Sequence, residues 1–290
     1  MLGQKDNRKP KNPFVVRRQR AALIRAAVQL VFFIAAPSVF SSAFAGVKEI
    51  CTAFGSGAVL AWSGFIAMLV LTLGFTIVFG RFFCGYACAF GAIGDWLYAL
   101  SDFVQKKTKR KLPQIPMRIQ KYMQYFKYVI LALILLLCVL GKQDVVNGHS
   151  PWTVFSLLRS GRGIPGGYAV AVALLIVILI GMVFQERFFC QFLCPMGAIF
   201  SLMPVIPFVG QLRRGDSCIP TCNACERMCP VSLKLEENSL RSGECITCGQ
   251  CVNTCPRENI TCMGGLLKGT EWWFVLARGA ALLVGILLMQ

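Results

Sequence analysis

Long apolar runs separated by short basic segments dominate this chain of 290 residues. A helix needs about 20 apolar residues to cross a hydrocarbon core of about 30 Å, and four runs reach or approach that length. They lie at residues 26–45, 58–80, 123–140 and 167–185. A fifth run, residues 272–290, is interrupted by Arg278, so it either spans with that side chain directed to the interface or lies at the interface. The pattern predicts an all-α integral membrane protein with four to five transmembrane helices.

Composition agrees with a membrane protein, because 56% of the residues are hydrophobic and only 15% are charged. A net charge of +17 would also suit nucleic acid, but the basic residues are sorted by segment. Eight Lys and Arg residues lie in each of 1–25, 81–121 and 187–271, against one in 46–57 and three in 142–166. This positive-inside pattern predicts a multi-pass protein of the cytoplasmic (inner) membrane, with its N-terminus in the cytoplasm and lipid, not nucleic acid, as its partner.

A motif of thirteen residues occurs twice in the chain. Residues 81–93 read RFFCGYACAFGAI and residues 187–199 read RFFCQFLCPMGAI, with eight identities. Such similarity indicates an internal duplication. Each copy follows a predicted span that runs toward the cytoplasm, so we expect two parallel repeats related by an axis along the membrane normal. The apolar stretches that follow, 93–104 and 199–209, are too short to span and are expected to lie at the interface.

Each copy of the motif contains a C-x3-C pair, and the duplication places the two pairs at equal depth. The four cysteines are Cys84, Cys88, Cys190 and Cys194. Positions i and i+4 share one face of a helix, so both pairs can point toward the axis and together hold a further iron-sulfur cluster. Two alternatives stay open for these residues, namely structural thiols packed in the core and a redox or copper-binding site.

Eight cysteines near the C-terminus form two ferredoxin-like runs, each closed by a Cys-Pro pair. The first run is Cys218, Cys222, Cys225 and Cys229, and the second is Cys245, Cys248, Cys251 and Cys255. The C-x2-C-x2-C-x3-C-P spacing of the second is typical of proteins with two [4Fe-4S] clusters, in which the fourth cysteine binds the neighbouring cluster. The first run has one extra residue after its first cysteine. Crossed ligation then assigns Cys218, Cys222, Cys225 and Cys255 to one cluster, and Cys229, Cys245, Cys248 and Cys251 to the other.

Structural zinc and disulfide bridges are the alternatives for these runs. Zinc ligands often come as two separated pairs, and a disulfide-bonded domain would have to be exported, which the charge pattern opposes. Cys51, Cys138 and Cys262 have no partner at ligand spacing and are expected to be packing thiols. The one histidine, His149, cannot provide bis-histidine ligation and no C-x2-C-H motif is present, so no haem is expected.

An Arg-Phe-Phe-Cys-x3-Cys motif that occurs twice ahead of a double-cluster domain resembles the NapH-type membrane ferredoxins, and the iron-sulfur modules of NosR and CcoG look similar. The resemblance covers about residues 20–265 and includes all twelve cysteines of the predicted sites. It implies four core spans, a cytoplasmic ferredoxin domain, and electron passage between the quinol pool or a cytoplasmic donor and a periplasmic acceptor. The chain departs from the family at Ala89, where proline is usual, at the extra residue between Cys218 and Cys222, and in the fifth apolar run.

These observations predict an iron-sulfur electron-transfer subunit of a membrane oxidoreductase complex, with other redox subunits and quinol as candidate partners. The alternative is an assembly or regulatory factor that senses redox state or reduces copper for insertion into an oxidase or reductase. No nucleotide-binding fingerprint is visible, so electrons are expected to come from a protein or a quinol. The expected organisation is a basic N-terminus (1–25), a first membrane repeat (26–105), a basic loop (106–121), a second repeat (122–210), a ferredoxin-like domain (211–265) and a C-terminal membrane helix (266–290).

Overall fold

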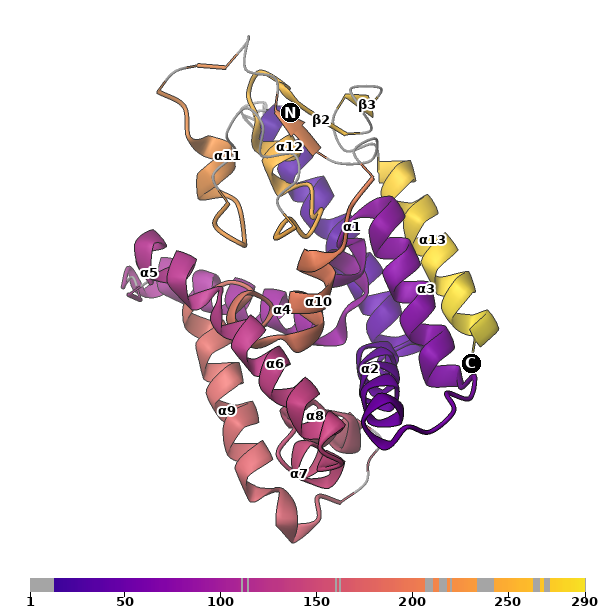
Figure 1. Ribbon diagram of the computed structural model, residues 1–290. Helices are drawn as coiled ribbons and strands as arrows, with labels where there is room; N and C mark the ends of the chain where they lie inside the picture. The colour runs from indigo at the N-terminus through magenta and orange to yellow at the C-terminus, as the bar shows by residue number, and fades with distance from the viewer. Residues whose placement is uncertain are drawn as a thin grey trace, which may run out of the picture.

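The computed structural model describes residues 13–110, 112–113, 115–159, 161, 163–206, 211–213, 218–219, 221–233, 243–262, 267–268 and 272–289. Most of these residues are helical, as predicted, and they form a bundle with the cysteine-rich segments at one end (Figure 1). The apolar faces of the helices meet in one continuous core that runs through the bundle.

The first half of the bundle consists of four helices and one π-helical turn. They are α1 (Pro13–Ala35), α2 (Val39–Ser56), α3 (Gly64–Phe79), the turn η1 (Phe83–Ala87) and α4 (Ala89–Thr108). Helix α3 starts at a cap in which the Ser63 hydroxyl accepts from the backbone N–H of Ile66 at 3.2 Å. Turn η1 follows α3 directly and contains the first repeated cysteine.

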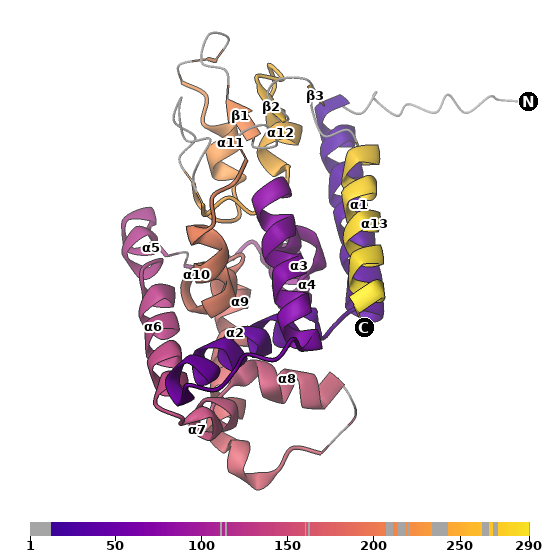
Figure 2. The ribbon, with the colours of Figure 1, turned by 45° about the vertical axis from the view of Figure 1, so that its right-hand side comes forward.

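The second half also contains an apolar helix that is followed by a π-helical turn. Its elements are α5 (Met117–Met123), α6 (Phe126–Val139), α7 (Gln143–Gly148), α8 (Pro151–Arg159), the 3-10 turn η2 (Gly166–Tyr168), α9 (Ala169–Phe184), the π-helical turn η3 (Phe189–Leu193) and α10 (Pro195–Leu202). Helices α7 and α8 lie near α2, at the end of the bundle opposite the cysteine-rich segments (Figure 2).

Three helical stretches among the described residues are long and apolar enough to cross a membrane. They are Arg118–Val139, Gly166–Phe184 and Trp272–Met289. The first two agree with the predicted spans 123–140 and 167–185. The predicted span 58–80 contains a shorter apolar helix of 16 residues, Gly64–Phe79.

The predicted span 26–45 is wrong as a single helix. The chain turns by 61° between Val15–Ala35 and Val39–Ser56, so this segment is either a broken span or a re-entrant loop. Pro37 stands at the break, and it disfavours helical backbone at the residue before it while lacking an N–H of its own. Helix α2 consequently lies across the end of the bundle (Figure 2).

The C-terminal run forms the helix α13 (Trp272–Met289), which packs beside α1 and α3 (Figure 2). Arg278 does not interrupt this helix. Its side chain is buried, and the guanidinium carbon lies 4.3 Å from the ring centre of Phe274 and 4.8 Å from that of Phe82. Cation–π contacts with two rings stabilise the charge inside the bundle.

The cysteine-rich segments contain two short helices and a small sheet. They are α11 (Ala224–Arg227), α12 (Gln250–Thr254), β1 (Gln211–Arg213), β2 (Ile260–Cys262) and β3 (Leu267–Lys268). The strands pair antiparallel in the order β1-β2-β3, with Leu212 opposite Thr261. This sheet adds to the predicted all-α fold, because strands of two or three residues are too short to show an alternating pattern in the sequence.

Candidate metal centres

The two repeated motifs adopt the same local structure, a π-helical turn that ends at the second cysteine. Cys88 and Cys194 both have extended backbone, with φ −72° and ψ 121° and φ −77° and ψ 112° respectively. Their backbone N–H groups donate at 2.9 Å to the carbonyls of Phe83 and Phe189. Turns of this type are rare and are found mostly at functional sites. The expectation that one regular helix face presents both thiols is therefore wrong, since the second cysteine leaves the turn and caps the next helix.

The four repeat cysteines lie together in the core of the bundle. Each is only 5–6% exposed, and all four belong to the same hydrophobic core. Cys194 interacts electrostatically with the other three thiols, Cys84, Cys88 and Cys190. Cys88 likewise interacts with Cys190 and Cys84. The structure therefore brings together the two C-x3-C pairs that the duplication predicted.

Backbone amides donate to the sulfur atoms of this group in the same way in both repeats. The N–H of Gly197 donates to Sγ of Cys194 at 3.1 Å, and Gly91, the equivalent residue, donates to Cys88. Among the described residues, no three His, Cys, Asp or Glu side chains are grouped to hold a single metal ion. Four thiols around one zinc ion would each have to lie about 2.3 Å from it, whereas the ligands of a cluster bind different irons and stand farther apart.

Arg187, the first residue of the second motif, reaches into the first repeat. It donates to the carbonyls of Cys84 and of Gly85, the latter at 3.1 Å, and makes two bonds of 2.7 and 2.6 Å to the Asp95 carboxylate. A Cβ placed on Gly91 would lie 2.2 Å from Nη1 of this arginine. Gly91 therefore leaves the space that the guanidinium fills.

Arg81, the first residue of the first motif, makes the corresponding approach to the second repeat. A Cβ placed on Gly197 would lie 3.1 Å from its Nη2. Its Nη1 donates at 3.1 Å to the carbonyl of Gly243 and lies 3.2 Å from the Glu244 carboxylate. Its Nε is buried and has no hydrogen-bond partner among the residues that the structure describes.

Two carboxylates pair with the buried cations around the repeat cysteines, and we call these charged residues the buried layer. Asp95 accepts at 2.6 Å from both Arg25 and Gln29, in addition to its bonds with Arg187. Glu244 pairs with Lys127, whose side chain is fully buried. Burial opposes ionisation of Glu244, but the nearby Arg81 and Lys127 outweigh it and lower the pKa of this carboxyl. Glu244 therefore stays charged at neutral pH.

The first predicted cluster set of the ferredoxin-like runs surrounds a small cavity. Its cysteines are Cys218, Cys222, Cys225 and Cys255, and they line this cavity with Ala224, Pro256, Asn259 and Ile260. The N–H of Asn259 donates to Sγ of Cys255 at 3.3 Å. Because Cys255 comes from the other run, the cavity fits the crossed arrangement that the spacing predicted. We call these four residues the distal set.

Two cysteines of the second predicted set lie against the bundle, and we call Cys229, Cys245, Cys248 and Cys251 the proximal set. Burial raises the pKa of the Cys229 thiol to about 12, with Cys248 and Cys245 contributing. Cys229 is thus close to cysteines of the other run. Cys229 and Cys248 pack against the core of the bundle, whereas Cys225 and Cys251 belong to a separate small core.

Both repeats contact the proximal set through the residue that follows the first cysteine of each motif. Gly85 faces the chain beside Cys248, and a Cβ placed on it would lie 2.5 Å from the Ile246 carbonyl oxygen. The equivalent residue of the second repeat, Gln191, donates at 2.5 Å to the carbonyl of Pro230. The backbone beside the proximal cysteines therefore contacts both motif turns directly.

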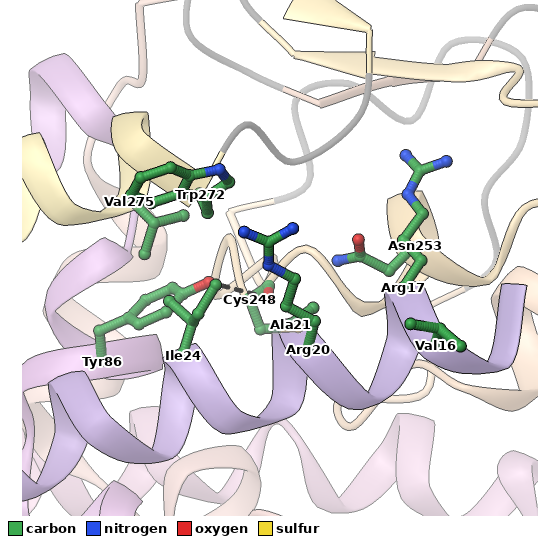
Figure 3. Close-up of a pocket in the computed structure, with 10 residues that line it drawn as sticks. All are labelled: Val16, Arg17, Arg20, Ala21, Ile24, Tyr86, Cys248, Asn253, Trp272 and Val275. Atoms are coloured by element: carbon green, nitrogen blue, oxygen red, sulfur yellow. Dashed lines mark hydrogen bonds between the residues drawn. The ribbon is translucent and has the colours of Figure 1, made fainter. Parts of the chain in front are cut away.

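A cavity of about 520 Å³ opens beside Cys248, between the N-terminal half of α1 and the start of α13 (Figure 3). The Tyr86 hydroxyl donates at 3.1 Å to the carbonyl of Cys248 on one wall. Arg20 stacks over the ring of Trp272 at 5.7 Å. This cavity brings solvent and potential partners close to a proximal cysteine.

The other residues singled out from the sequence lie away from these centres. Cys138 is fully buried and Cys51 packs against the same core, which agrees with packing thiols. The side chain of Cys262 is outside the described residues. His149 is exposed, and its Nδ1 lies 2.8 Å from the Val145 carbonyl.

Sequence reasoning missed the charged residues of the site. Asp95, Glu244, Arg25 and Lys127 stand far apart in the chain, and no spacing links them to the cysteines. Arg81 and Arg187 did carry a signal, because each begins one copy of the repeat and an arginine at the end of an apolar run is costly to bury.

Comparison with known proteins assigns the repeats to an iron-sulfur family. A model described as a 4Fe-4S binding domain matches residues 60–112 and 167–207. Each matched segment contains one C-x3-C pair, and neither contains a cysteine of the ferredoxin-like runs. No solved structure matches the chain.

Several curated proteins are similar to this chain. An uncharacterized protein of Methanocaldococcus jannaschii is 30% identical over 68% of this chain and 77% of its own length. The ferredoxin-type protein NapH of Haemophilus influenzae is 26% identical over 67% of this chain and 66% of its own length. The regulatory protein NosR of Pseudomonas aeruginosa is 28% identical over 61% of this chain but only 24% of its own.

Proposed function

This chain belongs to the NapH-type family of membrane ferredoxins, and we propose that it relays electrons through three iron-sulfur centres between a cytoplasmic or quinol donor and an acceptor in or beyond the membrane. An iron-sulfur electron-transfer role is common to the family. The number of centres, their order and the direction of flow are our proposal.

The observation that carries this proposal is the convergence of Cys84, Cys88, Cys190 and Cys194 within the segments matched by the 4Fe-4S model. Four thiols are the usual ligand set of a [4Fe-4S] cluster. The buried Nε of Arg81, which has no acceptor within the described part of the chain, and the reciprocal glycines fit a site built around a larger anionic group. When bound, the cluster would accept and release one electron.

The distal and proximal sets are proposed to hold the two ferredoxin-type [4Fe-4S] clusters. The cavity lined by Cys218, Cys222, Cys225 and Cys255 supports the distal assignment. The order distal, proximal, repeat follows from the contacts of Gly85 and Gln191 with the proximal loops. The protein's own contribution is to hold these loops against the repeat motifs and to keep water away from the four repeat thiols.

The orientation is proposed from the positive-inside pattern, with the ferredoxin-like segments and the N-terminus in the cytoplasm of an inner-membrane protein. Other redox subunits of a membrane complex are the proposed partners. The cavity beside Cys248 gives a donor, either a protein or a quinol, an approach to the proximal centre.

An assembly or regulatory factor is the second candidate, favoured by the relative that is named a regulatory protein. In that case the repeat cysteines would bind copper, which soft thiolates select. Copper that binds the purified protein, disappears in Cys84→Ser and Cys88→Ser variants and leaves the ferredoxin signals intact would support this candidate.

Iron and acid-labile sulfide per chain, measured on anaerobically purified protein together with EPR of the reduced state, test the proposal. About twelve irons per chain would support three [4Fe-4S] centres, and about eight would leave the repeat cysteines without a cluster. Zinc in place of iron would contradict the electron-transfer function itself.

A further inference from the structure

Arg81 and Arg187 form a reciprocal pair around the four repeat cysteines. They are 2% and 1% exposed, and each begins one copy of the motif while reaching the glycine of the other copy. Gly91 and Gly197 hold the same position in the two copies. A Cβ on Gly91 would also lie 2.9 Å from the Cys84 carbonyl oxygen, so side chains other than hydrogen do not fit there without a shift of the backbone.

Each arginine also interacts with cysteine thiols of both repeats. Arg81 interacts electrostatically with Cys84 of its own copy and Cys194 of the other. Arg187 interacts with Cys190 of its own copy and Cys88 of the other, and its Nη1 lies 4.0 Å from Sγ of Cys190. Each guanidinium therefore interacts with thiols of both repeats.

This layer carries more positive than negative charge among the described residues. Four buried cations, Arg25, Arg81, Lys127 and Arg187, pair with two carboxylates, Asp95 and Glu244, and a fifth, Arg278, lies over the Phe82 ring of the first motif. The buried cations thus outnumber the paired carboxylates. A third carboxyl, Glu186, lies nearby, but burial and then Asp95 raise its pKa to about 7, so it is only partly ionised at neutral pH. Leaving charge uncompensated in a protein interior costs several kcal/mol per ion.

We infer that Arg81 and Arg187 are charge-compensating and positioning residues for a dianionic metal–thiolate centre on Cys84, Cys88, Cys190 and Cys194, and that they raise its reduction potential. The inference rests on the proposed function. Four thiolates around a [4Fe-4S] core of charge 2+ carry two negative charges in total, which the excess of cations around them offsets. Reduction adds one more negative charge, and the two fixed guanidiniums stabilise that state. The repeat centre is therefore tuned to accept electrons from the proximal one.

The choice of arginine also has a geometric reason. Arg187 uses Nε and Nη2 to bind Asp95 and Nη1 to bind the Cys84 carbonyl, so three directions of its planar fork are occupied at once. A lysine has no such fork and would keep the charge without fixing its place. The guanidinium thus holds the motif turn of the other repeat in position as well as compensating the thiolates.

The test is an EPR-monitored redox titration of purified Arg81→Gln and Arg187→Gln variants, with iron counted on the same samples. We expect the midpoint potential of the repeat centre to shift in the negative direction in both variants, and by less in the corresponding Lys variants. Lys48→Gln is the matched control, because Lys48 is a half-buried cation that binds Asn147 at 2.6 Å near the opposite end of the bundle. Its repeat-centre potential should equal that of the wild type.

A repeat centre with full iron and an unchanged midpoint in both Gln variants would overturn the inference. The Glu244→Gln variant gives a second test that keeps both arginines. It removes the carboxylate that offsets Arg81 and Lys127, so the midpoint potential of the repeat centre should shift in the positive direction. An unchanged midpoint potential would contradict the inference. Failure of the proposed function is visible separately, since the wild type would then contain about eight irons and no third signal before any arginine is changed.

Discussion

Gly85 and Ile246 join the membrane repeat to the ferredoxin-like segment through their backbones. A Cβ placed on Gly85 would lie 2.5 Å from the carbonyl oxygen of Ile246 and 3.9 Å from the Cα of Cys248. Gly85 follows Cys84, and Ile246 lies between Cys245 and Cys248, so the backbones beside two predicted ligand sets touch. Electron transfer weakens steeply with distance, so the proposed transfer between these two ligand sets depends on this contact.

Replacing Gly85 by alanine should separate the two segments. The new methyl group meets backbone atoms that cannot rotate away, so we expect the proximal loop to move outward and electron transfer into the repeat centre to slow several-fold. Iron content should stay at the wild-type level. Stopped-flow reduction followed by rapid-freeze EPR would measure the rate. Gly74→Ala on α3 is the control, because nothing lies within 4 Å of the new Cβ; equal rates in the two variants would contradict the contact's role.

The Cys190→Ser substitution should remove the repeat centre alone. Cys190 is buried beside the other repeat thiols and belongs to neither ferredoxin-like run, so both ferredoxin signals should persist while about four irons per chain are lost. Reduction of the physiological acceptor should stop. Continued activity with that acceptor would place the repeat site off the electron path.

Cys255→Ser and Cys251→Ser should affect different clusters although the two residues are close in sequence. Cys255 lines the cavity of the distal set, and Cys251 is assigned to the proximal set. We expect each variant to lose or shift one EPR signal and to retain the other, with midpoint titration distinguishing the two. Loss of the same signal in both variants would contradict crossed ligation.

The Asp95→Asn substitution should strongly destabilise the bundle. It leaves Arg25 and Arg187 buried without a carboxylate, and removal of one partner from a buried ion pair costs about 3–5 kcal/mol. Asp102→Asn on the same helix is the control, since its pair with Lys106 is exposed and such pairs contribute at most about 1 kcal/mol. Thermal unfolding in detergent should show a large fall in the midpoint for the first variant only. Similar unfolding midpoints in the two variants would mean that the buried ion pairs of Asp95 do not stabilise the bundle.

Much of the fold was predictable because membrane spans are long and continuous. The runs 123–140 and 167–185 needed only hydropathy, and the structure places helices there. The prediction of one helix over residues 26–45 was wrong because hydropathy averages over Pro37, which breaks the helix without making the stretch less apolar. The small sheet was not predicted because its strands are only two or three residues long.

The sequence by itself determined the iron-sulfur class of this protein and its candidate ligand sets, since cysteine spacing and an internal repeat are local patterns that can be recognised without reference to the rest of the chain. Only the tertiary structure decided which charges surround those ligands. Arg187 meets Asp95 and Gly91 across a distance of about one repeat, and Arg81 meets Glu244 across more than half of the chain. Such partners are fixed by how helices pack, and packing depends on the summed shape of many side chains that no short motif records.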